Sequence, residues 1–213
     1  MKRGALVLRP EPGATRTVAS LTARGVAAVA CPLFEVRACA WEMPDLSRFD
    51  AVMLTSANAV RHGGADLAAL RGMSVYAVGE ATAAAATAAG LSVVDVGEDD
   101  AAALVTRLAA AGMRRVLHLA GRDHRTVSHP AVNIEHCIIY EAVETHVPQH
   151  FRELLAENPV LLLHSPRAAA RLSDLVPDGR DTLSLIAISD NCAAAAGTGW
   201  QDVAIAAKKR DDA

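Results

Sequence analysis

Short apolar runs alternate along the chain with alanine-rich stretches of helical character. Each run is rich in Val, Leu or Ile and ends at a polar turn. Runs of about four to six residues that alternate with helical segments are typical of parallel strands joined by crossover helices. The expected strands are residues 5–8, 26–31, 51–54, 74–78, 92–96, 116–119, 134–139, 160–163, 183–188 and 203–206.

An internal repeat divides these strands into two groups. The segment TSANAV at residues 55–60 is echoed by HSPRAA at residues 164–169, and each follows an apolar run. Ser56 precedes Gly79 by 23 positions, and Ser165 precedes Ser189 by 24. Each of these steps ends where a strand meets an alanine-rich helix. A kept spacing of this kind indicates two similar α/β halves instead of one large sheet.

The strand, helix and strand at the start of the chain lie before the first copy of the repeat, so they must join the sheet of one copy or the other. Joined to the later copy, they give two five-stranded parallel sheets flanked by helices. This predicts a discontinuous outer domain, residues 1–35 plus 142–213, and an inner domain, residues 36–141. The chain then crosses between domains through extended segments near 33–37 and 140–145. We expect these segments to form a two-stranded linker that acts as a hinge.

Composition narrows the class of protein. The chain has 213 residues and is 52% hydrophobic, yet it has no apolar run near the roughly 20 residues that span a membrane. Its net charge of −3 provides no broad positive field, so we expect no nucleic-acid partner. The N-terminal apolar run is too short for a signal peptide, so a cytoplasmic location is expected. The four cysteines form no CxxC pair, so buried thiols are expected.

Familiar catalytic and cofactor motifs are missing from the sequence. It contains no GxGxxG or GxxxxGK[ST] segment for nucleotides, no HExxH zinc motif and no GxSxG nucleophile elbow. The histidines at 118, 124, 129 and 136 fall on different expected elements, so no metal site is expected.

Candidate polar groups gather where strands are expected to end. Ser56 and Ser165 occupy N-cap positions, and Gly79 opens a helix whose backbone a ligand can approach. Helix capping is by itself sufficient to explain the two serines, and a tight turn explains Gly79 as well as a ligand does. Tyr140 is one of two tyrosines and can donate a proton or a hydrogen bond. Basic groups that would suit a substrate with many carboxylates are Arg9, Arg122, Arg125, Arg167, His118, His124 and His164.

Taken together, these motifs resemble the uroporphyrinogen-III synthase family over nearly the whole chain. Each motif alone is weakly specific, but their order and spacing are strong evidence. The matching segments are LVLRP at 6–10, CPL at 31–33, DAVMLTSANAV at 50–60, VYAVGEATA at 75–83, RVLHLAGR at 115–122, Tyr140, LLHSPRAA at 162–169, AISDNCAAAA at 187–196 and GWQDV at 199–203.

The resemblance implies two flavodoxin-like α/β domains joined by a two-stranded linker, and a cyclising lyase of tetrapyrrole and haem biosynthesis. The substrate would be hydroxymethylbilane, a linear tetrapyrrole with eight carboxylates, held in an interdomain cleft. The enzyme would release water and invert ring D to form uroporphyrinogen III. No metal or organic cofactor is implied, and a monomer is expected.

The resemblance also implies roles for particular residues. Tyr140 matches the tyrosine of the family and is the expected proton donor or leaving-group orienter. Arg122 and Arg167 are also expected to bind substrate, because they lie at expected strand ends. The residues that the match places along the cleft are Arg9, Thr55, Ser56, Gly79, Thr82, Ser165 and Ser189.

Two departures and two alternatives stay open. Cys192 stands where the family often has Thr, and residues 208–213 stand where relatives usually continue into a closing helix, which would leave one sheet face less covered. A non-catalytic two-lobed protein that binds a tetrapyrrole or another anionic small molecule is the main alternative. An α/β enzyme for a nucleotide-like substrate is the second, and it lacks the phosphate motifs. The sequence does not indicate whether the product flows to haem, sirohaem or corrinoids.

Overall fold

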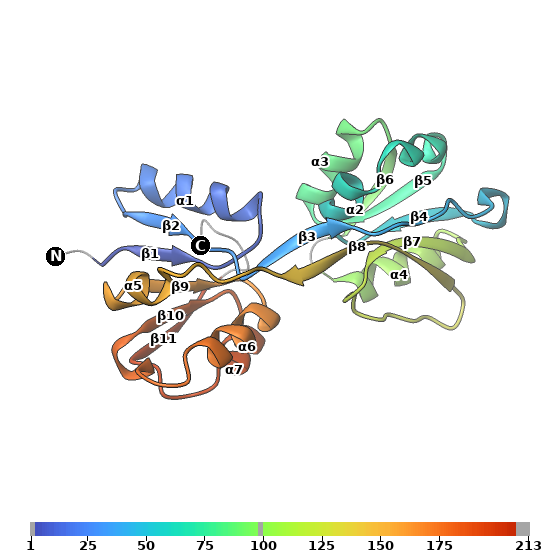
Figure 1. Ribbon diagram of the computed structural model, residues 1–213. Coiled ribbons are helices and arrows are strands. Elements are labelled where there is room, and N and C mark those ends of the chain that lie inside the picture. Colours follow the sequence, from blue (N-terminus) through green and yellow to red (C-terminus); the bar gives the residue numbers. More distant parts are fainter. Residues whose placement is uncertain (1–2, 98–99, 208–213) are drawn as a thin grey trace. The chain divides into compact units, whose positions relative to one another are not determined.

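The computed structural model of the chain describes residues 3–97 and 100–207 and divides into two compact units. Unit 1 consists of Met1–Glu35 with Val143–Ala213, and unit 2 is Val36–Ala142. The chain passes from one unit to the other within β3 (Phe34–Ala38) and returns within β8 (Asn133–Glu144), as Figure 1 shows. Residues 208–213, where the closing helix of the family was expected to be missing, lie outside the described residues.

Unit 1 is built on a parallel sheet of five strands in the order β11-β10-β9-β1-β2. Its strands are β1 (Ala5–Val7), β2 (Ala28–Ala30), β9 (Val160–Leu163), β10 (Ser184–Ala187) and β11 (Asp202–Ile205). Its helices are α1 (Gly13–Ala23), α5 (Phe151–Ala156), α6 (Pro166–Leu175) and α7 (Asp190–Ala196).

Unit 2 is built on a sheet in the order β3-β8-β7-β4-β5-β6. The pairs from β8 to β6 are parallel. Its further strands are β4 (Ala51–Leu54), β5 (Ser74–Val78), β6 (Ser92–Gly97) and β7 (Arg115–Gly121). Its helices are α2 (Ala57–His62), α3 (Glu80–Ala88) and α4 (Ala101–Ala110).

The mixed α/β class with helix-flanked parallel sheets is confirmed, and every expected strand is present. The expectation of five strands in the second sheet is wrong, because this sheet has six. The added strand is β3, which was expected only as an extended crossing segment. It lies next to β8 in the sheet. Just past the end of β3, Cys39 N donates to Ile139 O of β8 at 2.9 Å, and backbone groups in a strand need such partners.

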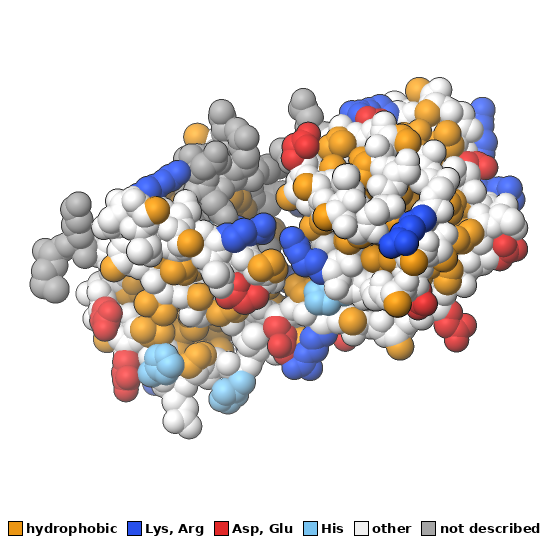
Figure 2. All heavy atoms as spheres, turned by 90° about the horizontal axis from the view of Figure 1, so that it is seen from above, with side chains coloured by type: hydrophobic (Ala, Val, Ile, Leu, Met, Phe, Trp, Pro, Cys, Tyr) orange, Lys and Arg blue, Asp and Glu red, His pale blue; other side chains and the backbone are white. Residues whose placement is uncertain are grey.

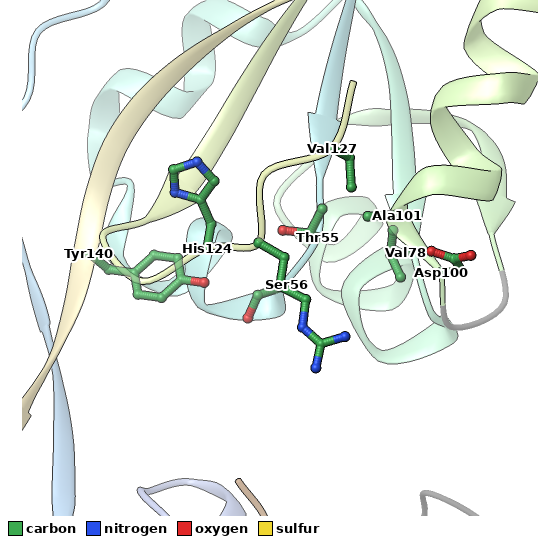
Figure 3. A pocket seen from close by; sticks show the side chains of 9 residues that line it. Thr55, Ser56, Val78, Asp100, Ala101, His124, Val127 and Tyr140 are labelled. Carbon is green, nitrogen blue, oxygen red and sulfur yellow. The ribbon is translucent and has the colours of Figure 1, made fainter. Parts of the chain in front are cut away.

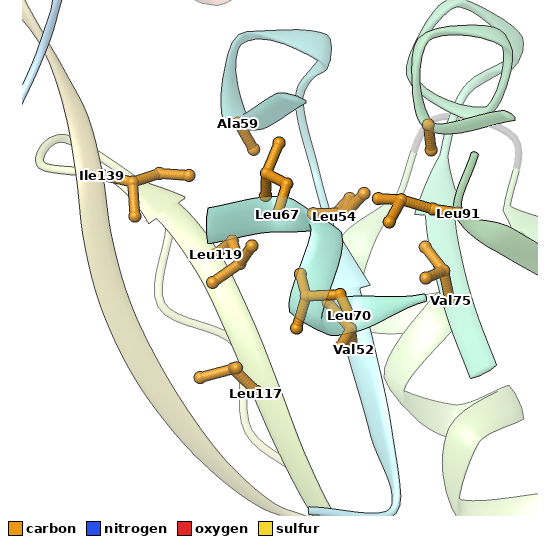
Figure 4. Packing of buried hydrophobic residues seen from close by; sticks show 11 residues of the cluster. Val52, Leu54, Ala59, Leu67, Leu70, Val75, Leu91, Leu117, Leu119 and Ile139 are labelled. Atoms are coloured by element: carbon orange, nitrogen blue, oxygen red, sulfur yellow. The ribbon is translucent and has the colours of Figure 1, made fainter. Parts of the chain in front are cut away.

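The sheet of unit 2 is buried on both faces, which explains why β4 reads as an unbroken apolar run. Val52 and Leu54 point to one face, where they pack with Leu67, Leu70 and other residues shown in Figure 4. Ala51 and Met53 point to the other face and pack against α4. All four β4 side chains are fully buried. Packing therefore fixes the carboxyl end of β4 and, with it, the place of the polar residues that follow.

The outer end of the unit 1 sheet is less covered. Ile186, Val203 and Ile205 are 38%, 40% and 46% exposed, although each lies on a strand. Acidic and basic side chains are interspersed on the face of the molecule shown in Figure 2, in keeping with the small net charge. Among the described residues, no helix has the length and apolar character needed to cross a membrane.

Helix starts follow the expected caps. Ser56 and Ser165 are N-cap residues with extended backbones, and their hydroxyls accept from Asn58 N and Ala168 N, each at 3.2 Å. Pro166 follows Ser165 at the start of α6, where its missing N–H leaves no bond unmade. These caps bring both serines to the carboxyl ends of central strands.

Candidate functional site

A polar pocket of about 300 Å³ lies in unit 2 at the carboxyl ends of its central strands. Figure 3 shows Thr55, Ser56, His124 and Tyr140 gathered around it. Its volume is at the lower end of the range for drug-sized ligands. The pocket can therefore receive one part of a large substrate. Its lining residues are Thr55, Ser56, Val78, Asp100, Ala101, His124, Arg125, Val127 and Tyr140.

The end of β4 positions the first two of these side chains. Thr55 follows the buried Leu54, and its Oγ1 lies 3.0 Å from His118 Nε2. Ser56 caps α2 and also hydrogen-bonds with the hydroxyl of Tyr140. The same short segment therefore connects the pocket to a buried histidine on one side and to a phenol on the other.

Tyr140 is positioned by an irregularity between two parallel strands. The pairing of β7 with β8 shifts between Ala120 and Gly121, so that Gly121 lies opposite Tyr140. The phenol hydroxyl also hydrogen-bonds with the backbone of Gly121. Burial raises the pKa of Tyr140, and the two hydrogen bonds oppose this effect only in part. The phenol is therefore protonated at neutral pH and is available as a hydrogen-bond or proton donor.

Gly121 leaves the space that the tyrosine ring occupies. A Cβ atom at this position would lie 2.5 Å from both Cε2 and Cζ of Tyr140. Such a distance is far inside ordinary van der Waals contact, so a larger residue at 121 would force the ring to move. The glycine of the RVLHLAGR segment thus determines where the phenol lies.

Three other expected substrate-binding residues of unit 2, Gly79, Thr82 and Arg122, do not line the pocket. Gly79 caps α3 with a positive φ of 78°, which favours glycine. Thr82 is buried one turn into that helix. Arg122 is an exposed side chain whose Nε bonds to Glu141 Oε2 at 2.7 Å. Of the expected arginines in this unit, Arg125 is the one that lines the pocket.

The remaining expected site residues belong to unit 1. Ser165 and Ser189 cap α6 and α7, and the hydroxyl of Ser189 lies 3.4 Å from Cys192 N. Arg9 follows β1, and its Nη1 lies 3.4 Å from Thr17 Oγ1. Arg167 stacks over the ring of Phe34 at 4.6 Å. Cys192 is fully buried and its thiol donates to Leu163 O, so it serves packing.

The structure corrects the view that the histidines are dispersed. His118 and His136 lie directly opposite each other on β7 and β8, and His124 approaches both from the following loop. The three side chains offer nitrogen atoms within 4.8 Å of one another. The sequence argument failed because residues on different elements become neighbours when parallel strands pair in register.

Four lining residues were not expected from the sequence: Val78, Asp100, Ala101 and Val127. Asp100 caps α4 by accepting from Ala102 N at 2.9 Å, and it also borders the pocket. The signal available was an Asp immediately before an alanine-rich helix. Val127 lies in the loop between β7 and β8, where no sequence pattern indicated a site.

These features define an α/β protein of parallel sheets with a polar pocket at the carboxyl ends of the strands, the usual ligand edge of such sheets. A family model described as uroporphyrinogen-III synthase HemD matches residues 15–213. The chain therefore belongs to the uroporphyrinogen-III synthase family, the cyclising lyases that convert hydroxymethylbilane to uroporphyrinogen III in tetrapyrrole biosynthesis.

Solved structures agree on the fold. A uroporphyrinogen-III synthetase from Helicobacter pylori superposes with a TM-score of 0.67 at 18% identity, over 98% of this chain and 94% of the other. A mutant uroporphyrinogen III synthase from Thermus thermophilus gives a TM-score of 0.52 at 14% identity, over 97% and 94%. Sequence comparison with curated proteins finds no significant match.

Proposed function

We propose that the pocket of unit 2 receives the reacting end of hydroxymethylbilane and that Tyr140 protonates its departing hydroxyl. The single observation that carries this proposal is the half-buried phenol of Tyr140, which lines the pocket and hydrogen-bonds with Ser56. A substrate hydroxyl needs a proton to leave as water, and a phenol kept protonated by burial can supply it.

The proposed chemistry balances as follows. The C–O bond of the hydroxymethyl group breaks, the leaving oxygen takes the proton of Tyr140, and water departs. The first ring becomes an azafulvene cation, whose pyrrole N–H returns a proton to the phenolate. The fourth ring attacks through its substituted carbon, and the resulting spiro intermediate fragments and recombines with that ring inverted. Meanwhile, hydrogen bonds from Ser56 and Gly121 stabilise the transient phenolate.

The position of the pocket within its sheet supports a ligand role. Numbered within unit 2, strands β4 to β8 have the order 3-2-1-4-5, so the strand order reverses between β4 and β7. Ligands of doubly wound sheets bind at such a switch point. Thr55 follows β4 and His124 follows β7, and both line the pocket.

The equivalent point in unit 1 carries the other expected substrate-binding residues. Its strands have the order 2-1-3-4-5, which is the flavodoxin-like order, with the switch between β1 and β9. Arg9 follows β1, and Ser165 and Arg167 follow β9. We propose that these residues and Ser189 hold carboxylates of the substrate, and that Gly79, Thr82 and Arg122 do so beside the unit 2 pocket.

Since the pocket takes only part of a tetrapyrrole, we propose that the two units act as domains that grip opposite ends of the substrate across a cleft. Holding both ends of a flexible chain in place favours one ring closure over another, and oriented intramolecular reactions reach effective molarities of about 10⁵ to 10⁸ M. We further propose that the protein acts as a cytoplasmic monomer, without nucleic acid or a membrane as partner.

The decisive experiment incubates the pure protein with freshly made bilane and measures the isomer ratio after oxidation to porphyrin. Formation of the type III isomer is expected. Only type I product, from unaided closure, would favour a non-catalytic binding protein. The Tyr140→Phe variant should lose at least about tenfold in kcat while remaining folded, because general acid catalysis contributes about 10² to 10⁴-fold. An unchanged rate would remove Tyr140 from the chemistry.

A further inference from the structure

We propose that His118, His124 and His136 form a binding site for a divalent transition-metal ion of the zinc class. The three residues come from β7, from the loop after it and from β8, all within unit 2. Their candidate ligand atoms lie within 4.8 Å of one another. The inference is independent of the proton transfer proposed for Tyr140, since it concerns a different set of side chains.

The geometry of the first pair is close to what an ion requires. His118 Nδ1 and His136 Nδ1 face each other at 3.1 Å. Two nitrogens bound to one tetrahedral zinc at about 2.0 to 2.1 Å lie roughly 3.3 to 3.4 Å apart. The observed distance between the two nitrogens is therefore only a few tenths of an ångström shorter than in a zinc site. Either one proton lies between these nitrogens, or both lone pairs point at a shared ion.

The opposite ring nitrogens are already engaged in the way that metal-bound histidines require. His118 Nε2 lies 3.0 Å from Thr55 Oγ1, and His124 Nδ1 lies 2.9 Å from Gly121 O. When an N–H donates at each of these positions, the other nitrogen of each ring keeps its lone pair for a metal. Such outer partners fix the tautomer and orientation of ligating histidines.

The central ligand lies in the interior of the unit. The His118 side chain is only 1% exposed, so bulk water has little access to it. A site of nitrogen donors suits Zn²⁺, Cu²⁺, Ni²⁺ or Co²⁺ better than the oxygen-seeking Mg²⁺ or Ca²⁺.

Completing the site requires a small adjustment of the third ligand. A tetrahedral zinc ion holds its nitrogen donors about 3.4 Å apart, so any pair in the cluster near the 4.8 Å limit would have to move closer. His124 lies on a loop and is only half-buried, so this ring can move. Three histidines leave a fourth coordination position for water or a carboxylate oxygen. Because His124 also lines the pocket, the ion would lie beside it.

Calorimetric titration of untagged, chelator-treated protein with ZnCl₂ tests the site. We expect one zinc ion per chain, a rise in Tm with added ZnCl₂, and a tetrahedral Co²⁺ absorption spectrum when CoCl₂ is used. His124→Gln and His136→Gln should each weaken zinc binding by at least about 100-fold, since loss of an outer partner alone costs about 10- to 100-fold. His146→Gln is the control, because His146 is an exposed histidine of unit 1.

Two outcomes would overturn the proposal. Absence of stoichiometric binding by the wild-type chain would mean that the three rings form only a hydrogen-bonded cluster. Equal zinc affinity in the wild type and in His124→Gln would place the ion elsewhere. The loop position of His124 makes its variant the decisive one should His136→Gln fail to fold. Because binding and Tm are measured without substrate, neither result depends on the outcome of the bilane assay.

Discussion

Replacing Gly121 by alanine should displace Tyr140 and reduce activity without removing any group that takes part in the chemistry. The added Cβ would lie 2.5 Å from two ring carbons of Tyr140, whereas ordinary contacts begin at 3.4 Å. The ring therefore has to move by about 1 Å, and a misplacement of that size can cost about 100-fold in rate. We expect kcat to fall by roughly this factor.

A double-mutant cycle separates this mechanism from general damage. If Gly121→Ala acts by moving the phenol hydroxyl away from Ser56, it should cost little more once Tyr140→Phe has removed that hydroxyl. Neighbouring residues that act through one group show such non-additive effects. The assay is the initial rate of type III isomer formation for the wild type, both single variants and the double variant. Circular dichroism and urea unfolding would check that each variant folds.

Gly97→Ala provides a matched control at the end of β6 in the same sheet. Its Cβ would lie 3.3 Å from Leu104 Cδ1, so the buried Leu104 side chain would have to shift by only a few tenths of an ångström. This variant should keep near wild-type activity. The reasoning would be refuted by wild-type kcat in Gly121→Ala, or by a full 100-fold loss caused by Gly121→Ala in the Tyr140→Phe background.

Two further predictions concern pH and substrate charge. In chelator-treated protein, the pKa of His118 rises from about 3 in the folded state to about 6.5 on unfolding, so the unfolded chain binds more protons and stability is lost as pH falls below 6.5. The groups that face His118 are His136, His124 and Thr55. Urea unfolding should show that the free energy of unfolding falls by about 2 kcal/mol between pH 7.5 and pH 5.0. An equal fall in the His118→Asn variant would assign the effect to other groups. Ser165→Ala should lower the free energy of unfolding by about 1 kcal/mol through loss of the α6 cap and should raise KM. Ser165→Asp should restore the cap yet raise KM further by repelling substrate carboxylates, and an unchanged KM in both variants would remove Ser165 from binding.

Much of the architecture was predictable because parallel strands buried on both faces leave a clear signal. The unbroken apolar run of β4 and the alanine-rich stretch of α3 identified their elements directly. The repeat of TSANAV and HSPRAA located Ser56 and Ser165 at equivalent helix caps. Local rules also explained why Pro166 and Gly79 stand at helix starts. Each of these features depends on residues close together in the sequence.

The sequence by itself thus determined the α/β class, the strands, the helix caps and the family resemblance. Only the tertiary structure decided which side chains meet. The shift in strand pairing beside Gly121 brings Tyr140 close to Ser56. The register of β7 and β8 places His118 directly opposite His136. The added strand β3 likewise depended on a partner, β8, far away in the chain. Register and side-chain proximity arise from contacts between distant segments, and a linear pattern of apolar and polar residues does not encode those distances.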